Sequence, residues 1–147
     1  MKLNQKQFDE LNNLDSWLYN YKSIKAGIEN LKLECEESKN VSIGSADPSK
    51  ETAVTNKFSS NVENSIINTE SLNNRAKFME SKIKKIDRAL SSLSKDEYLI
   101  VTNYYIEGKH IYEFTHELGI SESHCRRIKD RAINKIKIAL YGVQVKN

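Results

Sequence analysis

The sequence predicts an all-α protein, in which a long coiled-coil-like helical hairpin precedes a compact helix-turn-helix domain. Apolar residues recur at steps of three and four through most of the chain, which is the period of an α-helix. This pattern breaks once, around the only proline, Pro48. The last third of the chain instead contains short helical patterns bounded by capping residues and isolated glycines. We therefore expect residues 1–92 to form the hairpin, with a loop at 39–59, and residues 93–142 to form the second domain.

Composition fits this architecture and excludes several classes of protein. The 147 residues are 38% hydrophobic and 29% charged, as is common when each helix buries a single stripe. The longest apolar run, Tyr98-Leu99-Ile100-Val101, is far shorter than the roughly 20 residues that cross a bilayer. The first residues carry acids and amides where a signal peptide needs an apolar core. We expect a cytoplasmic protein with no membrane partner, in which Cys35 and Cys125 are reduced thiols.

The first predicted helix spans residues 5–38. Its apolar stripe requires a partner surface, since a helix of about 30 residues is not stable alone. Trp17 and Tyr19 widen the stripe. The positions that form it are Phe8, Leu11, Leu14, Leu18, Tyr21, Ile24, Ile28, Leu31 and Cys35.

The second predicted helix, residues 60–93, shows coiled-coil spacing and folds back on the first across the 39–59 loop. We expect the loop only to join the helices, although its serines and threonines could also contact DNA backbone or a partner. Polar Thr69 and Asn73 interrupt the seam, and such residues select register or oligomeric state. A homodimer through these helices and a monomeric hairpin packed on the second domain both remain open. The stripe contains Val62, Ile66, Thr69, Asn73, Ala76, Met79, Ile83, Ile86, Leu90 and Leu93.

The segment 93–140 reads as a series of short helical pieces. Ser94 and Glu97 form a capping box that starts a helix, with Tyr98, Leu99, Val101, Tyr105 and Ile106 as its apolar positions, and Gly108 provides its left-handed stop. A second piece, residues 111–118, places Ile111, Phe114, Thr115 and Leu118 on one face. A turn then follows, in which Gly119 adopts positive φ, Ile120 enters the core and Ser121 caps the next helix.

The last helix is predicted to bury one stripe and expose a polar, largely basic face. The buried stripe is Cys125, Ile128, Ala132, Ile133 and Ile136, and the outward residues are Glu122, Ser123, His124, Arg126, Arg127, Asp130 and Arg131.

Arginine is scarce in this chain and is concentrated in that helix. Of 23 basic residues only 5 are arginines, and Arg126, Arg127 and Arg131 are three of them. Arginine makes bidentate contacts to guanine edges and phosphates, whereas lysine provides a point charge. Residues 82–147 contain 13 Lys and Arg against 8 Asp and Glu, so this part carries the positive field that a phosphate-binding module needs.

Residues 93–136 resemble region 4 of the bacterial sigma-70 family, the helix-turn-helix that reads the promoter −35 element. The resemblance is carried by Leu93-Ser94-Lys95-Asp96-Glu97, by Tyr104-Tyr105 before Gly108, by Glu113-Phe114-Thr115 with Leu118-Gly119-Ile120-Ser121, and by Cys125-Arg126-Arg127-Ile128 with Arg131-Ala132-Ile133 and Ile136. In its layout the whole chain is similar to phage and prophage regulators of the RinA and ArpU type. Thr115 and His116 depart from the small residues usual in region 4, and no sigma region 2 is present.

This resemblance implies a transcriptional activator of phage late genes that binds double-stranded DNA and contacts RNA polymerase. A phage terminase small subunit, which couples a helix-turn-helix to oligomerisation helices, is the alternative. Such subunits usually place the DNA-binding domain first, and here it is last. A third reading is that the basic helix binds an acidic protein.

The expected DNA-binding residues lie on the last two helices. Glu122, Ser123 and Arg127 occupy the first turns of the recognition helix, where the resemblance also places base contacts. Phosphate contacts are expected from His124, Arg126, Arg131, Lys109 and Tyr112, and the capping Ser121 belongs to the same surface.

No metal, cofactor or enzymatic activity is predicted. His124 and Cys125 are adjacent, so on a helix they point about 100° apart and cannot easily share one ion, and no CxxC or HxxxH pair exists. The sequence also lacks a glycine-rich phosphate loop, a nucleophile elbow and a serine–histidine–aspartate pattern.

Overall fold

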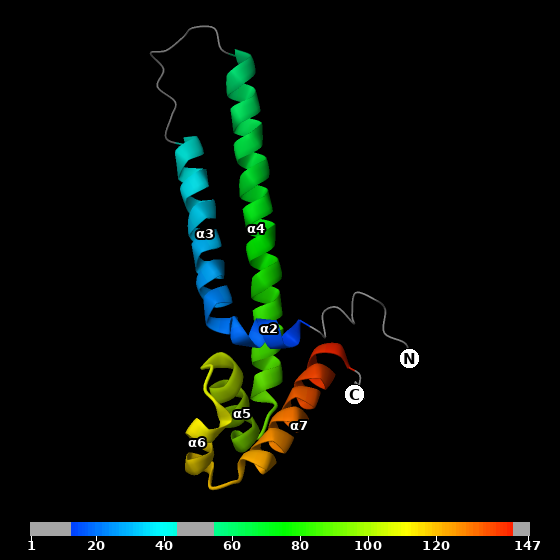
Figure 1. The fold of residues 1–147 in the computed structure, drawn as a ribbon. Helices are drawn as coiled ribbons and strands as arrows, with labels where there is room; N and C mark the ends of the chain where they lie inside the picture. Colours follow the sequence, from blue (N-terminus) through cyan, green and yellow to red (C-terminus); the bar gives the residue numbers. More distant parts are fainter. Residues whose placement is uncertain (1–12, 44–54, 143–147) are drawn as a thin grey trace. The chain divides into compact units, whose positions relative to one another are not determined.

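The computed structural model describes residues 13–43 and 55–142, and every element in these ranges is a helix (Figure 1). The predicted all-α class is therefore confirmed. No helix in the described ranges is both long and apolar enough to cross a membrane. In chain order the elements are α2 (Leu14–Tyr19), α3 (Tyr21–Ile43), α4 (Thr55–Ser91), α5 (Lys95–Val101), the π-helical turn η1 (Thr102–Ile106), α6 (Ile111–Leu118) and α7 (Glu122–Tyr141).

Contacts between residues divide the chain into two compact units. Of the described residues, 13–24 and 82–142 form one, which we call the terminal unit, and 25–43 and 55–81 form the other, the middle unit. The division crosses α3 and α4, so each of these helices contributes residues to both units. The domain boundary that the sequence predicts between residues 92 and 93 stays a prediction.

The main core of the terminal unit includes residues from near both ends of the described chain. Leu14 and Leu18 of α2 are 2% and 0% exposed. They pack in one cluster with Ile86 of α4, Val101 of α5 and Ile136 of α7. The short helix α2 is thus an integral part of the core that the C-terminal helices build.

A second, smaller core joins α5, α6 and α7. It contains Ile100, Ile111, Phe114 and Cys125. The sequence placed Tyr98 and Leu99 on the apolar face of α5, but they are 43% and 36% exposed, while Ile100 is fully buried. The prediction was wrong because α5 lies between two cores. Its consecutive residues Ile100 and Val101, about 100° apart on the helix, each enter a different core.

In the middle unit, α3 and α4 lie side by side and run in opposite directions (Figure 1). Lys32 Nζ donates to Glu80 Oε1 at 3.1 Å, and Cys35 Sγ lies 3.7 Å from the carbonyl oxygen of Thr69. The buried apolar side chains described here are few and mostly small, namely Ile28, Cys35 and Ala76. Where side chains are described, the seam between the two helices therefore buries few apolar groups.

The first predicted helix, residues 5–38, was wrong in two respects. The helix is interrupted at Asn20, which separates α2 from α3. Helix α3 then continues to Ile43. Asn20 Nδ2 donates to the carbonyl oxygen of Ser16 at 2.9 Å, a side-chain bond of the kind that competes with the helical ladder. Residues 5–12 of this prediction lie outside the described residues.

The predicted loop, 39–59, was too long. Helix α3 reaches Ile43 and α4 begins at Thr55, because residues 39–43 and 55–59 contain no glycine or proline to break a helix. The rest of the loop lies outside the described residues. Helix α4 ends at Ser91 rather than Leu93, where the hydroxyls of Ser91 and Ser92 donate to carbonyl oxygens three residues earlier, at 2.7 and 2.6 Å.

Candidate nucleic-acid interface

A tight turn between α6 and α7 sets the direction of the last helix. Gly119 adopts a φ of 65°, in the left-handed region that favours glycine, and its N–H donates to the carbonyl oxygen of His116. Ser121 has an extended backbone, and its Oγ accepts from the N–H of His124 at 3.2 Å. The left-handed glycine and the serine cap that the sequence predicts are both confirmed.

Helix α7 is anchored along one stripe. Cys125 is completely buried in the small core with Phe114, and Ala132, Ile133 and Ile136 are buried in the main core. Ile128 is half-buried. The predicted stripe is therefore confirmed. Burial raises the pKa of the Cys125 thiol, which keeps it protonated and suits a packing role.

A buried carboxylate connects α5 to α7. Glu97 is 6% exposed, accepts from the N–H of Ser94 at 3.0 Å and accepts from Lys135 Nζ at 2.7 Å. Burial alone would raise the pKa of Glu97, but these hydrogen bonds outweigh it, so the pKa lies below its usual value. The predicted capping box is present, and its carboxylate also pairs with α7. This pairing was not visible in the sequence.

Two further predicted site residues, Lys109 and Tyr112, lie just before α6 and in its first turn. Helix α5 passes directly into η1, whose wider turn is closed by a 2.9 Å bond from the N–H of Glu107 to the carbonyl oxygen of Thr102. The N–H of His110 then donates to Glu113 Oε2 at 2.7 Å. Tyr112 stacks on the ring of His110, with ring centroids 5.5 Å apart, yet stays 58% exposed.

All the residues predicted to bind DNA are exposed. They are Lys109, Tyr112, Ser121, Glu122, Ser123, His124, Arg126, Arg127 and Arg131. Arg126 Nη2 lies 3.7 Å from Glu122 Oε2, and both side chains are solvent-exposed, so this pair contributes little stability. Within the described residues, neither Arg127 nor Arg131 forms an ion pair with an acidic side chain.

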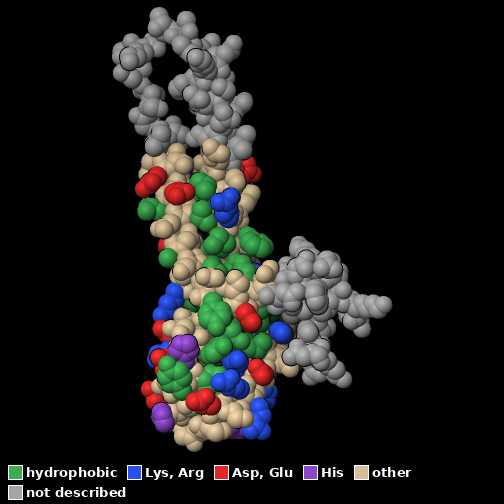
Figure 2. All heavy atoms as spheres, viewed as in Figure 1, with side chains coloured by type: hydrophobic (Ala, Val, Ile, Leu, Met, Phe, Trp, Pro, Cys, Tyr) green, Lys and Arg blue, Asp and Glu red, His purple; other side chains and the backbone are tan. Residues whose placement is uncertain are grey.

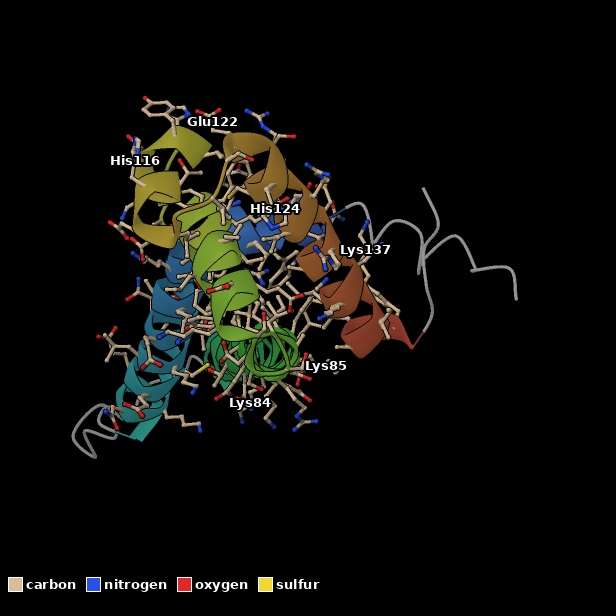
Figure 3. All side chains as sticks on the ribbon, turned by 90° about the horizontal axis from the view of Figure 1, so that it is seen from below. Lys84, Lys85, His116, Glu122, His124 and Lys137 are labelled. Atoms are coloured by element: carbon tan, nitrogen blue, oxygen red, sulfur yellow. The ribbon has the colours of Figure 1, made fainter. Side chains whose placement is uncertain are left out.

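Helical geometry separates these residues into a central face and a flank. At about 100° per residue, Ser123, Arg127 and Arg131 share the side of α7 opposite its buried stripe. Glu122 and Arg126 lie nearer the edge of that side. Figure 3 shows His116, Glu122 and His124 at the same end of the terminal unit, with Lys137 further along α7.

Two features of this surface were missed from the sequence. Asn134 is exposed on the central face, one turn beyond Arg131, and the same helical period would have identified it. Lys129 is instead held against the protein, with Nζ 4.3 Å from the ring centroid of Tyr104 and the side chain only 16% exposed. Acidic and basic side chains are interspersed on the face of the terminal unit drawn in Figure 2, so placement of individual arginines matters more than a uniform field.

Residues 11–138 match the model of a family described as protein of unknown function (DUF722). Because this match covers most of the chain, the protein belongs to that family. No curated protein and no solved structure matches the chain.

Proposed function

We propose that this member of the family is a sequence-specific DNA-binding transcription regulator, in which α6 and α7 form a helix-turn-helix. The observation that carries the proposal is the central face of α7. A helix fixed by two cores holds Ser123, Arg127 and Arg131 outward, and neither arginine is paired with an acid within the described residues. A rigid helix with available guanidinium groups is what recognition in the DNA major groove requires.

The proposed contacts follow from chemistry and position. Arg127 takes O6 and N7 of a guanine, and Glu122, once released from its weak pair with Arg126, accepts from a cytosine amino group. The hydroxyl of Ser123 accepts a hydrogen bond from a base edge or donates one to it. His124, Arg126, Arg131, Lys109 and Tyr112 contact phosphates, which fixes register without reading sequence.

The remaining helices provide the regulatory part of the proposal. Residues of α3 and α4 form a helical hairpin, which dimerises or contacts RNA polymerase. The region 4 resemblance supports promoter binding, and the resemblance to RinA-type and ArpU-type proteins supports a phage or prophage activator of late genes.

Selection of bound DNA from a random duplex pool tests the proposal. We expect one enriched sequence, and Arg127→Ala should weaken binding to it by about 1–3 kcal/mol and relax preference at one base pair. Arg131→Ala should weaken all sequences alike and reduce the salt slope by about one unit. Arg75→Ala, which removes an exposed arginine of the middle unit, is the matched control and should change neither.

No enrichment by the wild-type protein, or an unchanged preference in Arg127→Ala, would contradict the proposal. Light scattering measures the mass of the complex and distinguishes a regulator from a packaging protein. Two chains on a palindromic site fit a dimeric regulator, and a large ring fits a DNA-packaging oligomer.

A further inference from the structure

The end of α4 that belongs to the terminal unit carries an unusual excess of positive charge. Between residues 82 and 91 there are four basic residues and one acid. The acid, Asp87, accepts a hydrogen bond from the hydroxyl of Tyr21. Lys82 is also directed at the protein, with Nζ 4.4 Å from the ring centroid of Trp17. Lys84, Lys85 and Arg88 are the other basic residues of this stretch, and all three are exposed.

These three residues share one side of the helix. Ile83, Ile86 and Leu90 are buried on the opposite side, and at about 100° per residue Lys84, Lys85 and Arg88 fall within one arc facing away from the core. No acidic side chain of α4 between residues 82 and 91 lies in that arc, because Asp87 is turned toward Tyr21. Between residues 82 and 91 the charged side chains in that arc are therefore all basic. Acidic and basic side chains are instead mixed on the face of the terminal unit that Figure 2 shows.

The surface is separate from the central face of α7. In Figure 3, Lys84 and Lys85 lie on the other side of the terminal unit from Glu122 and His116. The main core, formed by residues of α4 and α7 among others, lies between the two helices. A straight duplex held against the start of α7 therefore cannot also lie along this part of α4.

We propose that Lys84, Lys85 and Arg88 form a second, sequence-independent binding surface for double-stranded DNA, so that one chain holds two duplex segments. The inference rests on the proposed function, which supplies the ligand. Clustered basic residues on an exposed helix provide charges that neutralise phosphates without reading bases, so this basic arc complements the duplex backbone. With both surfaces occupied, the protein bridges two sites or bends one long site around the terminal unit.

Stoichiometry provides the test. At low salt, wild-type protein is titrated with a random-sequence duplex of about 16 base pairs, and bound duplex per chain is measured by sedimentation. We expect two duplexes per chain for the wild type and one for Lys85→Gln with Arg88→Gln. The same double variant should lower the salt slope by about two units, since each phosphate contact contributes about 0.9. Lys39→Gln with Arg75→Gln removes two exposed charges from the middle unit and should leave two duplexes bound.

The outcomes separate the inference from the function on which it rests. One duplex per wild-type chain, or two still bound by the Lys85→Gln, Arg88→Gln variant, would overturn the second surface. Loss of one duplex by the middle-unit control as well would overturn it too, because binding would then follow net charge alone. The double variant Arg127→Ala with Arg131→Ala should also bind one duplex. If it binds two while Lys85→Gln with Arg88→Gln binds one, DNA binding by the central face of α7 is rejected and the second surface stands. No binding by the wild type rejects both.

Discussion

The terminal unit and the middle unit use helices in opposite ways. In the terminal unit, serine side chains cap α5 and α7, and the helices pack around two cores that contain branched and aromatic side chains. In the middle unit, α3 and α4 are long, and the buried apolar side chains described between them are Ile28, Cys35 and Ala76. The first arrangement fixes the direction of each helix, as a reading surface requires, whereas few described apolar side chains are buried between α3 and α4.

The same substitution in each unit should expose this difference most strongly. Cys125 is fully buried among core side chains, so Cys125→Asp places an unpaired charge there and should lower the free energy of unfolding by about 4 kcal/mol or more. Cys35→Asp should have a smaller effect, confined to α3 and α4. Circular dichroism during thermal melting, with DNA binding measured in parallel, checks this. Near-wild-type melting of Cys125→Asp would show that the phase of α7 is wrong.

A smaller effect is expected from truncating the α2 side chain that enters the main core. Leu18 is fully buried with residues of α4, α5 and α7, so Leu18→Ala should cost about 2–4 kcal/mol and weaken DNA binding. The matched variant Ile28→Ala belongs to the middle unit and should leave DNA binding of the monomer unchanged. Urea denaturation and a binding isotherm measure both effects. Equal loss of DNA binding in the two variants would mean that the units are not energetically separate.

The ion pair between α5 and α7 should contribute less, since Lys135 is half-exposed. Lys135→Met should lower the free energy of unfolding by about 1–2 kcal/mol near neutral pH. Because the folded pKa of Glu97 lies below its unfolded value, this stabilisation is complete above the unfolded pKa and is lost as pH falls through the folded pKa. The difference between wild type and variant should thus be constant from pH 8 to about 5 and shrink in stronger acid. A difference that grows on acidification would contradict the assignment.

The smallest effects should come from two glycines and should differ in sign. Gly119 has a φ of 65°, so Gly119→Ala should destabilise the terminal unit by about 1 kcal/mol. Gly27 lies inside α3, and an added Cβ would meet Met79 Cε at an ordinary 3.8 Å, so Gly27→Ala should stabilise by up to about 1 kcal/mol. Chemical denaturation of both variants provides the comparison. Stabilisation by Gly119→Ala would rule out the left-handed turn.

What could be predicted from the sequence was mostly local. The Ser94 cap, the bounds of α6, the Gly119 turn and the Ser121 cap each depend on residues within four positions of one another. The exposure of the site residues between Glu122 and Arg131 followed from the phase of α7. The interruption of the helix at Asn20 was missed because the apolar period continues through that residue. The π-helical turn η1 was missed because no sequence pattern that we used marks such a turn.

Contacts between distant residues could not be read from the sequence. Nothing near Glu97 indicates that its carboxylate binds Lys135, nor does anything near Tyr21 indicate Asp87. The packing of Leu14 and Leu18 against the C-terminal helices was also not visible, because an amphipathic stripe shows which side of a helix is buried and not which partner covers it.

In the main core, Leu14 and Leu18 pack against residues that follow them by about 70 positions or more. This separation has a consequence for synthesis on the ribosome. Helix α2 is translated early, but Leu14 and Leu18 have no complete surface to join until α7 has left the exit tunnel. Such long-range closure slows folding and leaves leucines accessible in the nascent chain. The competent reading helix should therefore arise only after translation of α7, and prematurely released fragments should be substrates for chaperones and proteases.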